Sequence, residues 1–270
     1  MASFLRLSAI FPAAHGESLL SWVSRLCDAN DVSTSELTSQ IVGRDSREFA
    51  ALATRVEHAI ALGCVTGCGT AIIRAMMHSE VDPAITTFFD QPIPWSALER
   101  GKRRIAPGQV TKGEVPFLRA LWSIRVISCD PTSGERLIDR CPCGNPLWWR
   151  SMHHLLKCSA CGQDIRLVPA VLGSERQIEV SRFWASMYSF QPRKRLEARS
   201  ALYSPIRDCD PGRLMRLAEY LGSIEELAHP RGLDSGTLLL KGLPGSVDHL
   251  SFSWRSAVKH TIDRIRASRL

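Results

Sequence analysis

The sequence predicts a mainly α-helical protein that carries one small zinc ribbon near its middle. Two observations lead to this fold class. Apolar residues recur every three or four positions before residue 78 and after residue 210, as they do on one face of a helix. Between these stretches lie two close pairs of cysteines, separated by 14 residues: Cys141 and Cys143, then Cys158 and Cys161. We therefore expect three parts: an N-terminal helical domain at 1–105, a zinc-ribbon module at 106–167 and a C-terminal helical domain at 168–270.

The N-terminal third is predicted to be a bundle of short helices. Residues 17–30 carry a helical apolar stripe, made of Leu19, Val23, Leu26 and Cys27. Residues 33–43 begin with Ser-Thr-Ser-Glu, the pattern of a capping box, and end in glycine. Further amphipathic helices are expected at 46–62 and 70–77. This pattern is compatible with a helix-turn-helix-like bundle. A plain helical bundle is favoured over direct base readout, because no cluster of basic or amide side chains marks a recognition helix.

Prolines and glycines interrupt the pattern between residues 90 and 115, so we expect a connector there. It contains a strongly basic run, Arg100-Gly101-Lys102-Arg103-Arg104. This run is either a contact to a phosphate backbone or a solvated linker. The C-terminal part is predicted to be helical again. Asp210 and Pro211 suit the N-cap and first position of one helix, and a last helix with a basic flank is expected at 254–265.

The two cysteine pairs suit a tetrahedral Zn²⁺ site. A glycine follows each pair, at Gly144 and Gly162, and lets the backbone curl so that its amides point at the sulfurs. Four thiolates close the coordination shell and leave no position for water, so we expect a structural ion. Two buried thiol pairs or a disulfide are the alternatives. His153 and His154 lie between the pairs, and either would become a ligand if one thiol dropped out.

Composition and charge indicate where the protein is located and which kinds of partner it binds. No apolar run is long enough to span a bilayer and no signal peptide is recognisable, so we expect a reducing, cytoplasmic location. The net charge of +7 is uneven: residues 1–105 carry 10 basic and 11 acidic side chains, and residues 168–270 carry 16 and 11. We therefore expect the N-terminal helices, including the exposed face of 17–30, to bind protein. The basic C-terminal half should meet nucleic acid through Arg193, Lys194 and Arg195.

The sequence gives no positive sign of an enzyme. It contains no glycine-rich phosphate loop followed by lysine, no Gly-x-Ser-x-Gly elbow and no His-Glu-x-x-His helix. Together with the closed metal shell, this predicts a protein without catalytic activity. A nuclease or another enzyme is the least favoured class.

Two segments share their order and spacing with a known family. The first is Phe11-Pro12 followed by His15-Gly16-Glu17-Ser18-Leu19-Leu20-Ser21-Trp22-Val23-Ser24-Arg25-Leu26. The second is Leu137-Ile138-Asp139-Arg140-Cys141-Pro142-Cys143-Gly144, continuing to Cys158-Ser159-Ala160-Cys161-Gly162. Over roughly residues 11–167 the chain resembles the TniQ/TnsD family of transposon target-selection proteins. Family members often carry an additional zinc finger that ends in Cys-Pro-x-His. Here Cys129-Asp130-Pro131-Thr132 lacks the histidine, so we expect one zinc ion and not two.

The resemblance implies a bacterial, non-catalytic adaptor for DNA transposition. Such an adaptor links a target-recognition complex to an AAA+ ATPase regulator that recruits the transposase. The recognition complex is either a CRISPR effector with its guide RNA or target DNA bound directly, and a homodimer is among the assemblies left open. The alternative is a sequence-specific DNA-binding regulator with helix-turn-helix and zinc-ribbon modules. A regulator should bind one duplex sequence alone, whereas an adaptor should bind its protein partners.

Overall fold

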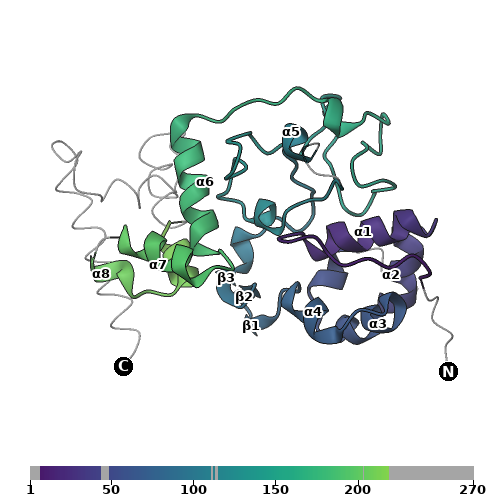
Figure 1. The fold of residues 1–270 in the computed structure, drawn as a ribbon, viewed down its shortest axis with the longest axis horizontal. Helices are drawn as coiled ribbons and strands as arrows, with labels where there is room; N and C mark the ends of the chain where they lie inside the picture. The colour runs from purple at the N-terminus through teal and green to yellow at the C-terminus, as the bar shows by residue number, and fades with distance from the viewer. Residues whose placement is uncertain (1–6, 44–48, 111, 113–114, 203, 219–270) are drawn as a thin grey trace.

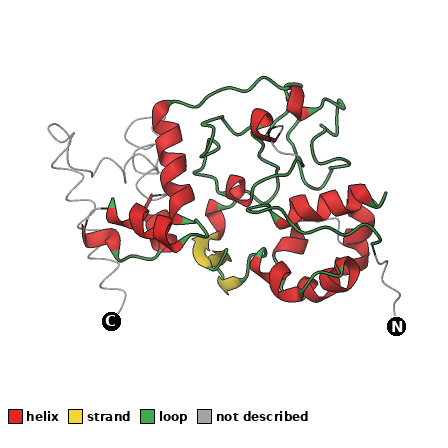
Figure 2. Cartoon of the chain, in the orientation of Figure 1, coloured by secondary structure: helices red, strands yellow, loops and turns green. Residues whose placement is uncertain are grey.

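The computed structural model describes residues 7–43, 49–110, 112, 115–202 and 204–218 (Figure 1). These residues form mostly helices, one small sheet and a loop-rich middle (Figure 2). The first helices and the last described helices lie at opposite ends of the molecule, and the loops of the cysteine region lie above the first helices in this view. The predicted fold class, mainly α with a small metal-binding ribbon, is confirmed.

The N-terminal part contains α1 (Leu19–Ala29), α2 (Thr34–Val42), the 3-10 turn η1 (Phe49–Ala53), α3 (His58–Thr66) and α4 (Thr70–Ala75). The helices expected at 17–30, 33–43 and 70–77 are confirmed. The single helix expected at 46–62 is wrong, because turns at residues 54–57 separate η1 from α3. η1 packs on α1 and α2, and α3 packs on α2, α4 and η1.

α1 lies at the centre of this part. The hydroxyl of Ser18 caps it by accepting a hydrogen bond from the backbone N–H of Ser21 at 3.2 Å. Most of the helix is buried: Leu19, Leu20, Ser21, Trp22, Val23, Ser24, Leu26 and Cys27. α2 and η1 cover part of it, and Met152 of the cysteine region places its sulfur 3.9 Å from Ser24 Oγ. α1 therefore offers little surface to a partner.

The residues just before and within α1 form a buried polar network around Glu17. The Glu17 carboxylate accepts three hydrogen bonds, from Ala14 N at 2.9 Å, Ser21 Oγ at 2.8 Å and Arg25 Nη1 at 2.6 Å. The guanidinium of Arg25 also lies over the Phe11 ring, 4.7 Å from its centre. Because Glu17 is fully buried, these partners are what keeps its charge inside the fold.

The same segment is joined to residues far along the chain. Ser21 Oγ accepts a hydrogen bond from Leu118 N at 2.9 Å, and Ser18 N donates to Leu118 O at 3.0 Å. Ala120 N donates to Gly16 O at 2.9 Å. Gly16 has a φ of 75°, which a residue with a side chain adopts only with strain. The motif at the start of the chain therefore fixes the position of residues 118–120.

A three-stranded antiparallel sheet follows α4, in the order β1 (Glu80–Asp82), β2 (Ile85–Phe88) and β3 (Gln91–Pro94). Phe89 and Asp90 form the tight turn between β2 and β3, with φ values of 45° and 63°. The connector expected at 90–115 is therefore wrong for its first residues. Pro92 and Pro94 led to that prediction, but among the described residues β3 pairs with β2 alone, and an edge strand tolerates proline.

Two arginines of the basic run at residues 100–104 bind backbone groups inside the protein. Arg103 is 1% exposed. Its guanidinium donates to three backbone carbonyls just before the second cysteine pair: His154 O at 3.0 Å, Leu155 O at 2.5 Å and Lys157 O at 3.3 Å. Arg104 donates to three others: Trp122 O at 3.0 Å, Ile124 O at 2.7 Å and Ile127 O at 2.7 Å. For these two arginines, both expectations, a phosphate contact and a solvated linker, are wrong.

The middle of the chain is built from loops with short helical turns: η2 (Trp95–Ala97), α5 (Pro107–Val110), η3 (Ala120–Ser123) and η4 (Ile165–Leu167). Single antiparallel bridges flank the two cysteine turns. One bridge joins Arg140 to Pro146 and another joins Lys157 to Asp164. The apolar residues beside these bridges, Leu147 and Ile165, are buried, so they anchor the loops to the core.

Helices return in the C-terminal part with α6 (Glu175–Met187), α7 (Pro192–Ser200) and α8 (Ser204–Arg207). Ser174 and Gln177 form a complete capping box at the start of α6. The predicted helix start at Pro211 is confirmed, with Asp210 as its N-cap. The helix expected at 254–265 lies outside the described residues. None of the helices that the structure describes is long and apolar enough to cross a membrane.

Buried hydrophobic side chains gather in two clusters. The first cluster joins the N-terminal helices to the cysteine region, with members such as Trp22, Leu62 and Leu155. The second joins the sheet, residues 120–127 and the C-terminal helices, with Phe88 and Trp184 among its members. Each cluster draws residues from more than one of the three domains expected from the sequence, and that division stays a prediction.

Arg103→Met is expected to lower the free energy of unfolding by about 3 kcal/mol. The substitution removes three hydrogen bonds and leaves the buried carbonyl of Leu155 without this donor, at about 1–3 kcal/mol for that group, and part of the loss is offset because a charge no longer has to be buried. Chemical unfolding of the full chain measures the change. Arg100→Met, in the same run but exposed, is the control and should shift stability by less than about 1 kcal/mol. Equal, small effects of both substitutions would contradict the role given to Arg103.

Candidate metal centre

The structure brings the four predicted cysteines together. The Sγ atoms of Cys141, Cys143, Cys158 and Cys161 all lie within 4.8 Å of one another. The Cys141 and Cys161 sulfurs are 3.6 Å apart, and the Cys143 and Cys158 sulfurs are 3.8 Å apart. Cys141 and Cys158 are buried, whereas the other two are exposed. Within the described residues, this is the one group of His, Cys, Asp and Glu side chains that could hold a metal ion.

Each cysteine pair lies on a tight turn that a glycine completes. Gly144 and Gly162 have φ values of 86° and 74°, in the left-handed region that favours glycine. Gly144 N donates to Cys141 O at 2.8 Å, and Gly162 N donates to Cys158 O at 3.0 Å. The two glycines therefore let the backbone curl at each turn, as expected.

Burial and backbone amides set the charge of the thiols. Burial raises the pKa of Cys158, but the amides of Cys161 and Ala160 and the neighbouring thiols outweigh it and lower the pKa to about 6. Burial raises the pKa of Cys141 to about 12, and the thiols beside it add to the shift. Thiolates this close together repel one another, so their pKa values move apart unless a cation lies among them.

The spacing of the sulfurs suits a tetrahedral metal ion. A disulfide bond is about 2.05 Å long, far shorter than the 3.6 and 3.8 Å between the paired sulfurs, so no disulfide joins them here. Around an ion with metal–sulfur bonds of about 2.3 Å, the sulfurs of a regular tetrahedron stand about 3.8 Å apart. Four thiolates in this geometry favour Zn²⁺ or iron. The cysteines could therefore hold one such ion.

Arg103 connects this centre to the rest of the fold. It donates to the carbonyls of His154, Leu155 and Lys157, shortly before Cys158, and its charge acts on the Cys158 sulfur. Burial lowers the pKa of Arg103 to about 10, so the guanidinium remains charged at neutral pH. Apolar residues of the same loop pack into the first hydrophobic cluster: Met152, Leu155, Leu156 and Ile165. The cysteine turns are thus anchored on their buried side.

The two histidines between the cysteine pairs do not join the cluster. His153 and His154 are both exposed. His154 Nδ1 lies 3.9 Å from Asp28 Oδ1, at the end of α1. The alternative in which a histidine replaces a thiol has no support in this geometry.

A second tight turn, at residues 129–135, lies where the family resemblance implies a lost zinc finger. The carboxylate of the buried Asp130 accepts from Trp122 Nε1 at 2.9 Å, Thr132 N at 3.0 Å and Ser133 N at 2.9 Å. Gly134, with a φ of 76°, closes the turn. Hydrogen bonds to Asp130 therefore hold this turn. The expectation of one zinc ion and not two stays a prediction.

The three residues assigned to nucleic acid lie in the first turn of α7. Arg193 is exposed and forms an ion pair with Glu197 at 3.1 Å. Lys194 is exposed, whereas Arg195 is half-buried and donates to Ser189 O at 2.7 Å. Two of the three side chains are thus engaged within the molecule, and their contact with nucleic acid stays a prediction.

The sequence did not reveal the polar residues that support this centre. Arg103 and Arg104 belong to a run of like charges, a pattern typical of solvated segments. One signal was present, since the apolar pair Ile105 and Ala106 follows directly and is fully buried. Asp130 carried no comparable signal, because an aspartate before proline is common in exposed turns.

Part of the chain matches the model of a known family. The model of the TniQ family matches residues 10–130. The matched segment includes the Glu17 network, the small sheet, the buried Arg103 and the half-buried Arg104, and it ends before the first cysteine of the metal centre. No curated protein matches the chain.

Cys158→Ser is expected to release the metal and unfold the cysteine turns, because the binding energy of a structural metal is also folding energy. Elemental analysis should fall from about one ion per chain to near zero, and thermal unfolding should occur at a lower temperature. Acid should release the ion from the unchanged protein as well, because only deprotonated thiols bind it.

Cys64→Ser is the matched control for this experiment. Cys64 is an exposed cysteine on α3, outside the cluster, and its replacement should leave metal content and stability unchanged. Wild-type protein without metal, or a Cys158→Ser variant that keeps its ion, would refute the metal centre.

Proposed function

We propose that this chain, which belongs to the TniQ family through its residues 10–130, is a non-catalytic target-selection adaptor for DNA transposition. It would link a target-recognition complex to an AAA+ ATPase regulator and the transposase. The recognition complex is either a CRISPR effector with its guide RNA or the target DNA itself. The family match is the observation that carries the proposal, because a TniQ domain implies a role associated with transposition.

The metal in this proposal is one structural Zn²⁺ ion. The four cysteines fill all four positions of a tetrahedral shell and leave none for water or substrate. Such an ion supplies folding energy and no reaction chemistry. A closed centre of this kind supports a role in binding and assembly over one in catalysis.

The residues that carry the family resemblance at the start of the chain also support a scaffold. Glu17, Ser21 and Arg25 bind one another inside the fold. These side chains are used to position residues 118–120, so they are not available to a reacting group. The surfaces that meet partners must lie elsewhere.

We assign the AAA+ regulator to the outer face of α3 and α4. α1, the helix on which the sequence suggested a partner surface, is almost entirely buried. By contrast, Ile60 on α3 is 57% exposed and Ile72 on α4 is 59% exposed, and the two helices pack on each other. Contiguous exposed apolar surface is typical of a protein-binding site, and these two exposed side chains on adjoining helices support the assignment.

The double substitution Ile60→Glu with Ile72→Glu is expected to weaken binding of the AAA+ regulator at least tenfold, because it places two charges in an apolar contact. Binding is measured by pull-down and titration with a purified AAA+ transposition regulator, and transposition is counted in cells. Metal content and thermal stability should not change. Leu196→Glu, on α7 and 67% exposed, is the control and should bind normally.

Two outcomes would count against the adaptor role. If the double substitution leaves ATPase binding intact, the surface assignment is wrong. If the wild-type chain binds no ATPase and instead binds one duplex sequence tightly by itself, the chain is a DNA-binding regulator.

A further inference from the structure

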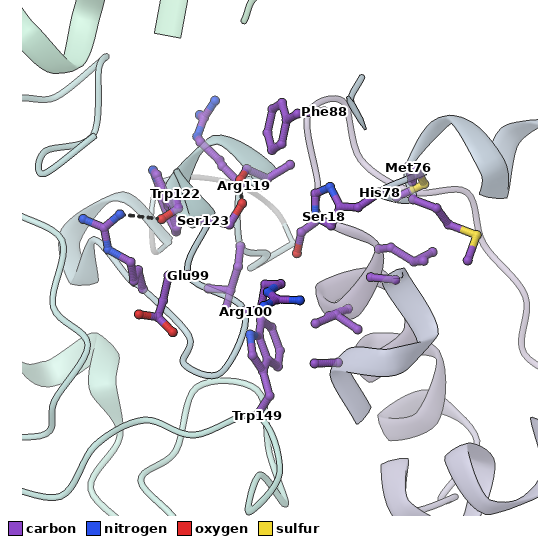
Figure 3. Close-up of a pocket in the computed structure, with 18 of the residues that line it drawn as sticks. Ser18, Met76, His78, Phe88, Glu99, Arg100, Arg119, Trp122, Ser123 and Trp149 are labelled. Carbon is purple, nitrogen blue, oxygen red and sulfur yellow. Dashed lines mark hydrogen bonds between the residues drawn. The ribbon is translucent and has the colours of Figure 1, made fainter. Parts of the chain in front are cut away.

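A basic hollow with aromatic walls lies between η1 and the loop that joins the two cysteine pairs. Its volume is about 400 Å³, and it is lined by η1, residues 98–101, Arg125 and residues 148–150. It borders a smaller cavity of about 60 Å³. Figure 3 shows the smaller cavity, with Arg100 and Trp149 lying close together on the wall that the two hollows share. The smaller cavity is too small for a base, so the larger hollow is the candidate site.

Positive charge dominates the larger hollow. Its lining includes three exposed arginines from three segments, Arg100, Arg125 and Arg150, and one carboxylate, Glu99. Three positive charges and one negative charge leave a net charge of +2. Glu99 is occupied within the fold: it accepts hydrogen bonds from Gly101 N at 3.1 Å and Lys102 N at 3.2 Å, and its Oε2 lies 3.6 Å from Arg125 Nη2. The remaining charge is available to an anionic ligand.

Two neighbouring tryptophans supply the aromatic walls. Trp149 is buried and packs on Phe49, with ring centres 5.9 Å apart. Trp148 is half-buried, and the guanidinium carbon of Arg150 lies 5.0 Å from the centre of its ring. Gly101 fits closely against this ring, since a Cβ atom there would lie 3.3 Å from a Trp148 ring carbon. Trp149 N also donates to Gly101 O at 2.9 Å, so the rings are positioned before any ligand arrives.

We propose that this hollow binds a single-stranded segment of nucleic acid. Guanidinium groups bind phosphates through paired hydrogen bonds, and tryptophan rings stack on bases. Single strands offer both groups at once, whereas a duplex keeps its bases stacked inside. An acidic peptide would satisfy the arginines but leave the indole rings unused. The volume lies within the roughly 300–1,000 Å³ of ligand sites in general, which is room for a base and its phosphate.

The test is fluorescence anisotropy of the full-length chain with labelled oligonucleotides of about 16 nucleotides. Single-stranded RNA, single-stranded DNA and duplex DNA are separate arms, so that the source of the single strand is identified. Trp148→Ala should weaken binding of the preferred single strand about tenfold and leave duplex binding unchanged. Trp148→Phe keeps a ring that can stack and should retain most of the affinity.

The arginines are tested by salt dependence. Arg150→Gln should weaken single-strand binding severalfold and lower the slope of log K against log salt by about 0.7, the value for one lost phosphate contact. Arg74→Gln, on the exposed side of α4 and away from the hollow, is the matched control and should change neither quantity. Metal content of each variant reports whether the cysteine turns are intact.

Unchanged affinity of both Trp148→Ala and Arg150→Gln would overturn the proposal. The proposal would also fail if the substitutions lowered the affinity for single strands and duplexes equally. It would fail as well if polyglutamate displaced the labelled oligonucleotide as strongly as an unlabelled single strand does. Either result describes a basic surface without base stacking. The measurement uses the chain alone. Its failure therefore leaves the adaptor role standing, and a failure to bind the ATPase leaves this inference standing.

Discussion

The buried guanidinium of Arg103 is the interaction on which the arrangement of the parts depends. It donates to the carbonyls that precede the second cysteine pair, while its neighbour Arg104 donates to carbonyls at residues 122–127. These two adjacent arginines thereby bind two separate parts of the protein. Arg103 binds the metal-binding loop, which packs in the first hydrophobic cluster, and Arg104 binds the segment at residues 122–127, which contributes to the second. Loops bury few apolar residues and leave many backbone carbonyls without a partner in regular secondary structure. These six hydrogen bonds supply partners for such carbonyls, as the hydrogen bonds between strands do in a sheet.

Buried polar groups act in the same way throughout the part of the chain that matches the TniQ family. The Glu17 carboxylate accepts three hydrogen bonds at the start of α1, and the Asp130 carboxylate accepts hydrogen bonds in the turn at residues 129–135. The hydrogen-bond partners of each carboxylate lie within eight residues of it, so each carboxylate fixes the local path of the chain.

The metal centre and the basic hollow are mechanically linked. Trp148, Trp149 and Arg150 lie between the two cysteine pairs, so the same turns that gather the sulfurs also place one wall of the hollow. The carbonyls that bind Arg103 belong to this loop as well. A metal ion that fixes both ends of the loop therefore also fixes the residues that we propose contact nucleic acid, although none of them touches the sulfurs.

The sequence by itself determined the features that depend on near neighbours. Ser18 and Ser33 cap α1 and α2, Gly43 ends α2, and the glycines after the cysteine pairs complete their turns, because each of these contacts spans only a few residues. The tertiary structure decided which charges of the basic run are buried, since the acceptors of Arg103 lie about 50 residues away. It also decided the break at residues 54–57 and the proline-containing strand β3, because packing partners and pairing strands from other segments override local preference.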